Sequence, residues 1–464
     1  MRRDAPSRLS LIALLVCVGA IALPCAPVSA QCVPFEEHSL GALTPFGGQR
    51  IGTSVDINAD RAVVGSVQGI HILARDSESR WLASTVLTAP DTDADDLFGV
   101  AVALSPTTLV VGASLDDSYA PNGGAVYVLD FNGDAPLQFQ QLSDAAPQPT
   151  AWFGRTVAVS ADTIAVAAPN ADTPELNAGS VSIFTRSGPL WHHHQTLTPP
   201  NPFALDAFGV SLSLEGDTLA IGAPGADLAA PNAGAVFIYT RLGSTWTLTD
   251  QLVATDAAVF DAFGQSVDLD NDSLAVGAWA DDDTAQNAGA VYVFRRVGPL
   301  WIEQQKLTAQ DAGVSDMLGA SVAIEDDLLV AGAVRADGSA PDSGASLVFR
   351  RENAHWTQIA TIPGDAPDAY AGSAVALSQG LLLTGAPFAD TPETDTGAVR
   401  SFDLGALACP ADVDLDCDVD VEDVITYIAA FKSELPWADT APPETVLDFA
   451  DILAFIASFT LGCP

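Results

Sequence analysis

An aspartate-rich segment near the C-terminus is the part of the chain whose residue types and spacing point most clearly to chemistry. Residues 409–423 read Cys-Pro-Ala-Asp-Val-Asp-Leu-Asp-Cys-Asp-Val-Asp-Val-Glu-Asp. Counted from Asp412, side-chain oxygens fall at positions 1, 3, 5 and 12, as a calcium loop of the EF-hand kind requires. Without a cation, so many neighbouring carboxylates would repel one another. The spacing therefore indicates a calcium-binding loop.

A helix is expected directly after this loop, and the same loop-helix unit occurs twice. The run over residues 423–431 recurs over residues 451–459. Each run places apolar residues at helical spacing, which suits two helices that pack face to face. These residues are Val424, Tyr427, Ile428 and Phe431 in the first run and Ile452, Phe455, Ile456 and Phe459 in the second.

Residues 408–464 resemble a dockerin module, in the cysteine-containing form called GC-type, which starts with Cys-Pro-Ala-Asp and ends with Gly-Cys-Pro. The resemblance implies a small all-α domain of paired EF-hand-like loop-helix units. It also implies attachment to a protein partner, either cohesin-like or a cell-surface anchor. By this likeness one calcium ion is bound by the side chains of Asp412, Asp414, Asp416 and Asp423 and by the backbone carbonyl of Asp418.

Two departures limit the expected metal content. Position 6 of the first loop, normally Gly, is Cys417, and the second loop has Ala441 and Pro443 where ligands belong. We expect one calcium ion at most from the first loop, and little or none from the second. A capped helical hairpin without metal is the alternative.

The preceding part of the chain, residues 31–404, is organised by a repeat of 47 to 55 residues. Each copy opens with an apolar residue and a Gly, and a second small residue, usually Gly, follows 14 residues after the opening residue. The seven openings are Ile51-Gly52, Phe98-Gly99, Phe153-Gly154, Phe208-Gly209, Phe263-Gly264, Leu318-Gly319 and Ala371-Gly372. The second landmarks are Gly65, Gly112, Ala167, Gly222, Gly277, Gly332 and Gly385.

Each copy contains four short β-prone runs, which in the fifth copy are residues 266–269, 274–277, 290–294 and 301–307. The turn between the first two runs is only Asn271-Asp272, as a tight hairpin requires. A repeat of this length with four strands is typical of a propeller blade. The seven copies therefore predict an all-β, seven-bladed β-propeller.

The Phe-Gly openings and the Gly-Ala-Pro at residues 222–224 and 385–387 resemble the FG-GAP repeat. This repeat forms the blades of the integrin α-chain propeller and of many secreted bacterial proteins. Calcium-binding copies in that family have an Asp-x-Asp-x-Asp-Gly loop between the two landmarks. Here a tight hairpin occupies that space, and the nearest likeness, residues 268–272, lies partly in a strand, so we do not expect integrin-type calcium sites.

The two ends of the repeat region are expected to complete each other. The seventh copy stops after its third run, residues 397–402, whereas residues 33–45 look like a closing run without a blade of their own. A propeller must close to remove its open sheet edges. We therefore expect the N-terminal segment to supply the fourth strand of blade seven.

Five tryptophans and six Asp/Asn pairs recur at fixed positions. Trp81, Trp191, Trp246, Trp301 and Trp356 each open the fourth run of a copy. We expect them to pack between blades, with a ligand-binding array as the alternative. The pairs are Asp117/Asn122, Asp172/Asn177, Asp227/Asn232, Asp282/Asn287, Asp337/Asp342 and Asp390/Asp395. We expect them to hold loops through backbone amides, with weak cation or sugar binding as the alternative.

No catalytic grouping stands out in the sequence. The run His192–His194 falls in an outer strand, where alternate side chains face opposite sides, so three ligands cannot converge there. Acidic residues are so frequent that a carboxylate pair for glycoside chemistry cannot be singled out.

Residues 1–30 have the parts of a secretory signal: basic residues, an apolar run over 9–23 and the sequence Val-Ser-Ala before Gln31. The run is shorter than a bilayer span, and no other segment approaches one. After signal removal Cys32, Cys409, Cys417 and Cys463 remain. We favour a Cys409–Cys463 disulfide, with Cys32 and Cys417 either paired or free.

A net charge of -41, from 18 basic and 59 acidic residues, argues against nucleic-acid partners. We expect a secreted or cell-surface bacterial protein whose non-catalytic propeller presents a binding or adhesion surface, for a polysaccharide or a protein, and whose C-terminal module anchors it. The alternatives are a polysaccharide-degrading enzyme, either a glycoside hydrolase or a lyase, and a passive structural protein of the envelope.

Overall fold

The computed structural model describes residues 35–40, 49–59, 61–75, 81–88, 95–132, 135–352, 354–390 and 394–404. The chain divides into one unit, Cys32–Ala408, and a second that joins Met1–Gln31 with Cys409–Pro464. The predicted signal segment 1–30, the four cysteines and the predicted dockerin-like domain 408–464 all lie outside the described residues. The structure described below is that of the first unit.

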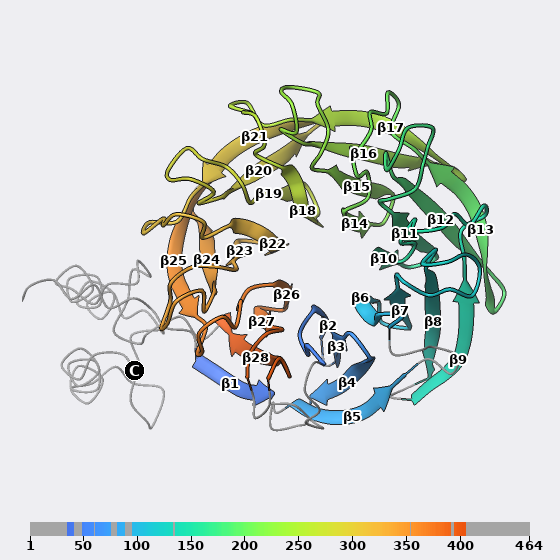
Figure 1. Cartoon of the computed structure of the whole chain (residues 1–464), viewed down its shortest axis with the longest axis horizontal. Coiled ribbons are helices and arrows are strands. Elements are labelled where there is room, and N and C mark those ends of the chain that lie inside the picture. Colours follow the sequence, from blue (N-terminus) through green and yellow to red (C-terminus); the bar gives the residue numbers. More distant parts are fainter. Residues whose placement is uncertain are drawn as a thin grey trace, which may run out of the picture. The chain divides into compact units, whose positions relative to one another are not determined.

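This unit contains seven antiparallel four-stranded sheets that follow one another around a ring (Figure 1). In six of the sheets the first strand in the chain lies nearest the centre of the ring and the last lies outermost; in the seventh, β26 is innermost and β1 outermost. The predicted all-β, seven-bladed propeller is therefore confirmed.

The blades are numbered in chain order. Blade 1 contains β2 (Ser54–Asn58), β3 (Arg61–Ser66), β4 (Gly69–Arg75) and β5 (Trp81–Leu87). Blade 2 contains β6 (Phe98–Leu104), β7 (Thr108–Ala113), β8 (Ala125–Asn132) and β9 (Ala135–Leu142). Blade 3 contains β10 (Thr156–Ser160), β11 (Thr163–Ala168), β12 (Ser180–Ser187) and β13 (Leu190–Leu197). Blade 4 contains β14 (Ser211–Glu215), β15 (Thr218–Ala223), β16 (Ala235–Leu242) and β17 (Thr245–Leu252).

Blade 5 contains β18 (Phe263–Asp270), β19 (Ser273–Ala278), β20 (Ala290–Val297) and β21 (Leu300–Leu307). Blade 6 contains β22 (Leu318–Glu325), β23 (Leu328–Ala333), β24 (Ala345–Glu352) and β25 (His355–Pro363). Blade 7 contains β26 (Ala374–Ser378), β27 (Leu381–Ala386), β28 (Ala398–Asp403) and, from the other end of the unit, β1 (Phe35–Leu40).

The ring is closed by the N-terminal strand. Strand β1 pairs antiparallel with β28, in a register that runs from Phe35 opposite Asp403 to Leu40 opposite Val399. Blades 7 and 1 also meet through a parallel bridge between Gly397 and Ile51. The expectation that the N-terminal segment completes blade seven is confirmed.

Neighbouring blades approach each other most closely at the landmark glycines. A Cβ atom added to Gly277 of blade 5 would lie 2.0 Å from the carbonyl oxygen of Gly319 in blade 6. The same carbonyl accepts a 2.8 Å hydrogen bond from the Ser266 hydroxyl of blade 5. Gly319 itself has φ +88, a conformation that residues with a side chain rarely adopt. The second landmark of one blade thus lies in contact with the opening Gly of the next blade.

This contact recurs around the ring, including where blade 7 meets blade 1. An added Cβ would lie between 1.9 and 2.1 Å from the next blade's landmark carbonyl at Gly65, Gly112, Gly222, Gly277, Gly332 and Gly385. Blade 3 is the exception, because it has Ala167 at this position. We call this contact between landmarks the junction. It explains why the two landmarks keep a constant spacing of 14 residues in the sequence.

The recurring tryptophans pack between blades, as predicted. Trp246 of blade 4 is buried in a cluster that also contains Val181 and Ile183 of blade 3. Its backbone is held by the Gln195 side chain of blade 3, which accepts from the Trp246 amide at 3.0 Å and donates to the Trp246 carbonyl at 2.9 Å. Gln140 with Trp191 and Gln305 with Trp356 form the same pair of bonds.

We predict that Gly277→Ala lowers the free energy of unfolding by about 3 kcal/mol, because the new methyl group would overlap a backbone carbonyl that cannot move aside. Ala167→Gly in blade 3 is the matched control, and should cost at most about 1 kcal/mol. Denaturant unfolding of both variants checks this. Equal losses in the two variants would contradict the proposed role of the junction.

Candidate functional site

One edge of the ring gathers its longest loops, and we call this edge the loop rim. It consists of the loops between the second and third strands of blades 2 to 6 and the loops that lead from blades 2 to 5 to the next blade. The first set covers residues 114–124, 169–179, 224–234, 279–289 and 334–344, and the second covers residues 143–155, 198–210, 253–262 and 308–317. The two sets are joined by backbone bonds, such as that from the Phe260 amide to the Pro231 carbonyl at 3.1 Å.

The recurring Asp/Asn pairs hold these loops in shape. In each pair the Asp carboxylate accepts a hydrogen bond from the backbone amide five residues later, for example Asp227 from Asn232 at 2.7 Å. The second residue of each pair has a positive φ, between 49 and 52 degrees. The same bond joins the loop-rim pairs that start at Asp117, Asp172, Asp282 and Asp337 and, in blade 7 outside the loop rim, the pair that starts at Asp390. These contacts are the ones expected if the pairs hold their loops through backbone amides.

The loop rim also exposes large apolar side chains. Phe260 is 65% exposed and Leu205 is 58% exposed. Both have left-handed backbones, with φ of 74 and 71 degrees, which costs roughly 1 to 2 kcal/mol for a residue with a bulky side chain. The other large apolar side chains exposed on the loop rim are Tyr119, Trp152, Leu176, Phe203, Leu228, Val259 and Val314. The left-handed conformation recurs at the equivalent residues Thr150, Ser315 and Asp368, so it belongs to the repeat. A large, exposed apolar side chain at this position occurs only at Leu205 and Phe260 among these five residues.

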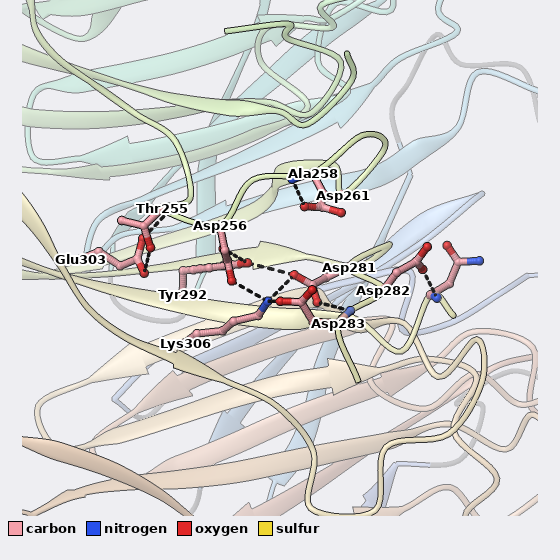
Figure 2. A network of polar contacts seen from close by, with 11 residues as sticks. Thr255, Asp256, Ala258, Asp261, Asp281, Asp282, Asp283, Tyr292, Glu303 and Lys306 are labelled. Atoms are coloured by element: carbon pink, nitrogen blue, oxygen red, sulfur yellow. Dashed lines mark hydrogen bonds and ion pairs between the residues drawn. The ribbon is translucent and has the colours of Figure 1, made fainter. Parts of the chain in front are cut away.

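A lysine-centred network occupies the loop rim at blade 5 (Figure 2). The Lys306 ammonium lies 2.9 Å from Asp256, 2.7 Å from Asp281 and 2.6 Å from Asp283. The Tyr292 hydroxyl donates to Asp256 at 2.8 Å and to Asp281 at 2.9 Å. Asp256 comes from the loop between blades 4 and 5, so the network ties that loop to blade 5.

The electrostatics of this network favour a structural role over a catalytic one. Burial would lower the pKa of Lys306, but its hydrogen bonds to Asp281, Asp283 and Asp256 raise the pKa above its ordinary value. Burial and the carboxylates of Asp256 and Asp281 also raise the pKa of Tyr292. Burial would raise the pKa of Asp256, but the bonds from Lys306 and Tyr292 lower it. Lys306 therefore stays charged and Tyr292 stays protonated, so neither can act as a base near neutral pH.

A second group of carboxylates lies on the inner strands. Asp56 on β2 accepts from the Leu104 amide of blade 2 at 2.6 Å. Asp268 on β18 accepts from the Ile324 amide of blade 6 at 2.8 Å and from the Ser213 hydroxyl of blade 4 at 3.0 Å. Burial raises the pKa of Asp56 to about 6 and that of Asp268 to about 7.

The residues singled out in the sequence have different outcomes. His192, His193 and His194 are exposed on β13. Within the described part of the chain, no group of three His, Cys, Asp or Glu residues is arranged to hold a metal ion. The predicted calcium ligands Asp412, Asp414, Asp416, Asp418 and Asp423 lie outside the described residues. The described residues also contain no helix long and apolar enough to cross a membrane.

Sequence reasoning missed both the Lys306 network and the two inner carboxylates. When the seven copies of the repeat are compared in the sequence, both features stand out. Lys306 is one of only two lysines in the chain. The fourth residue after each opening Gly is Ala or Ser in five copies and Asp only at Asp56 and Asp268.

We predict that Lys306→Met lowers the free energy of unfolding by about 3 kcal/mol, because it leaves three converging carboxylates without their cation. Gln251→Met is the matched control, since Gln251 occupies the same register position in blade 4 and is exposed. It should change the free energy by less than about 0.5 kcal/mol. Adding Asp256→Asn and Asp283→Asn to Lys306→Met should recover part of the loss. Failure of thermal or denaturant unfolding to separate Lys306→Met from the control would refute the structural role.

Comparison with known proteins assigns the family. The model of the FG-GAP repeat matches residues 81–129, 138–184, 191–239, 246–294 and 301–349, which together make up more than half of the chain. Each matched segment starts in the outer strand of one blade and ends in the third strand of the next blade. No curated protein matches the chain. The chain belongs to the FG-GAP repeat family.

Proposed function

We propose that this protein is a secreted, non-catalytic propeller that binds a partner through its loop rim and is anchored by its C-terminal module. FG-GAP repeats typically occur in extracellular and cell-surface proteins, and the sequence of residues 1–30 has the form of a bacterial secretory signal. The observation that carries the binding role is the pair of exposed, left-handed residues Leu205 and Phe260.

At these two positions the repeat sets a left-handed backbone, and the residue that adopts it is bulky, apolar and exposed. A bulky residue in the left-handed region is strained, and an exposed apolar side chain gains nothing from burial within the ring. Residues that combine both features tend to occur at binding sites, where a partner supplies the missing contacts. Backbone bonds link the loops in pairs, so Leu205 lies beside Leu176 and Phe260 beside Pro231.

The charged and apolar side chains of the loop rim suit some classes of ligand and not others. Exposed carboxylates such as Asp172, Asp227 and Asp282 accompany the apolar side chains on the loop rim. A nucleic acid would be repelled by these charges. A protein or a polysaccharide can offer apolar surface together with hydrogen-bond donors, so these are the two ligand classes that we propose.

The anchoring role is assigned to residues 408–464. In this proposal one calcium ion, bound by Asp412, Asp414, Asp416, Asp418 and Asp423, orders the first loop so that the module can bind a cohesin-like protein or another cell-surface anchor. The support is the carboxylate spacing together with the dockerin-like sequence, which includes the terminal Gly-Cys-Pro.

We expect Leu205→Gly and Phe260→Gly to raise the free energy of unfolding by up to about 1 kcal/mol each, because Gly relieves the left-handed strain. The same variants should lose binding of envelope polysaccharide or protein in a pull-down with the full chain. Leu242→Gly is the control, since Leu242 is 67% exposed on a hairpin outside the loop rim. This control should be destabilised and should bind normally. Normal binding by both rim variants would exclude the loop rim as the binding surface.

We expect the full chain to bind one calcium ion in calorimetric titration and to capture its anchor only when calcium is present. Asp412→Asn with Asp414→Asn should abolish both effects, because two first-loop ligands are lost. Asp439→Asn with Asp448→Asn in the second loop should leave both unchanged. Capture of the anchor in the presence of a chelator would refute a calcium-dependent anchor, whatever the loop rim binds.

A further inference from the structure

We propose that His71 makes the seam between blades 7 and 1, where the two ends of the ring meet, sensitive to acid, so that protonation of this imidazole loosens the closed ring. This property does not depend on what the loop rim or the C-terminal module binds. It follows from the surroundings of one buried side chain.

His71 lies on β4, the third strand of blade 1, and only 3% of the residue is exposed. It stands directly opposite Val64 of β3. Leu73, two residues farther along the same face of β4, packs in one cluster with Val64 and with Leu383 and Val399 of blade 7. His71 therefore faces the seam at which blade 7 meets blade 1.

Two other blades have a ring with a polar atom at the equivalent position, and both provide it with an acceptor. The Tyr127 hydroxyl of blade 2 donates to Asp116 at 2.7 Å, and the Tyr292 hydroxyl of blade 5 donates to Asp281 at 2.9 Å. Both aspartates come from the long loop between the second and third strands of their blade. Blade 1 has only residues 67–68 between these strands, so it lacks the loop that supplies the acceptor.

The ring of His71 has no acceptor for a second proton. Its Nδ1 atom is buried and has no hydrogen-bond partner among the described residues. A neutral imidazole donates from one nitrogen only, whereas the charged imidazolium donates from both. Protonation would therefore leave a buried N–H group without an acceptor, and it would place a charge in an apolar cluster.

The strands packed on β4 supply arginines rather than carboxylates. Strand β4 packs on β3, β5 and β6. Within these four strands the titratable residues besides His71 are Arg61 on β3 and Arg75 on β4 itself. Arg61 lies over the Phe131 ring, 4.1 Å from its centroid, and Arg75 lies 6.0 Å from the centroid of the Trp81 ring. Both charges are positive, so neither can neutralise an imidazolium.

The groups on the strands at the seam are bonded elsewhere. Strand β2 packs on β26 and β27, and neither of these two contains a titratable residue. Asp56 on β2 accepts from the Leu104 amide. Strand β28 has Arg400, which pairs with Asp365 at 3.2 Å, and Asp403 at its end. In the described part of the chain, none of these carboxylates bonds to Nδ1 of His71.

The sign of the pH dependence follows from these surroundings. Burial lowers the pKa of His71 below its ordinary value of 6.5, which agrees with the missing acceptor. As the pH falls through 6.5, the unfolded chain takes up a proton at this residue, whereas the folded ring resists it. The stability that depends on the neutral ring is therefore complete above about pH 7.5 and is lost progressively below about pH 6.5.

Thermal unfolding between pH 5 and 8 tests this proposal with His71→Phe, which introduces the residue that blade 4 has at the equivalent position, Phe237. The midpoint temperature of wild type should fall in acid relative to that of His71→Phe. The control, His192→Phe, removes an exposed histidine on β13 and should follow the wild-type curve. If His71→Phe does not fold, His71→Leu introduces the residue of blade 6, Leu347. Parallel curves for wild type and whichever variant folds would overturn the proposal.

Proton uptake on unfolding provides a second readout. At pH 5.5 wild type should take up as much as about one proton more than His71→Phe, measured by calorimetry in buffers of different ionisation enthalpy. Equal uptake by the two proteins would overturn the proposal.

Hydrogen exchange locates the effect. After correction for the intrinsic exchange rate, amides of β4 and β28 in wild type should lose protection between pH 7.5 and 5.5, whereas those of β20 in blade 5 should not. His71→Phe should keep the protection of all three strands. An equal loss in β20, or the same loss in the variant, would contradict an acid-sensitive seam.

Discussion

The near-contact between a glycine of one blade and the landmark carbonyl of the next is the constraint on which the rest of the ring depends. At Gly277 there is no room for a methyl group between the blades, and the same holds at five further positions. This contact fixes the distance between inner strands, so that the Ser266 hydroxyl can reach the next blade. Farther out, Trp246 fills the widening space, and Gln195 holds its backbone. Blade 4, for example, has all of these contacts, through Gly222, Ser211 and Trp246.

Features that follow from the repeat could be predicted from the sequence. Seven openings gave the number of blades, the missing strand of the last copy indicated the role of residues 33–45, and the fixed tryptophan position indicated packing between blades. These inferences succeed because periodicity averages over local irregularities and because a closed ring leaves few alternatives for its ends.

Features that do not repeat with a constant residue type escaped prediction. The Lys306 network needs Asp256 from the loop between blades 4 and 5, and no local sequence pattern joins residues 50 positions apart. The left-handed backbone shared by Thr150, Leu205, Phe260, Ser315 and Asp368 gives no sign in the sequence, because the residue type at this position varies. Asp56 and Asp268 stand where the other copies have Ala or Ser, but their bonds to neighbouring blades join residues far apart in the chain, which no local pattern reveals.

Acidic residues of the ring lie in three kinds of surroundings. On the loop rim, carboxylates such as Asp227 accept backbone amides and remain exposed, so their charge costs little. At blade 5 a lysine neutralises a cluster that would otherwise repel itself. On the inner strands, Asp56 and Asp268 are part-exposed and accept hydrogen bonds from the amides of Leu104 and Ile324 in neighbouring blades.

Closure of the ring by β1 is the most direct test of this architecture, because the junctions close a circle only if blade 7 is complete. Hydrogen exchange of the β28 amides, compared between the full chain and a chain that starts at Gln49, measures it. We expect the β28 amides to be protected in the full chain as strongly as those of β20, and to lose that protection when β1 is removed. Equal protection of β28 with and without β1 would contradict closure by the N-terminal strand.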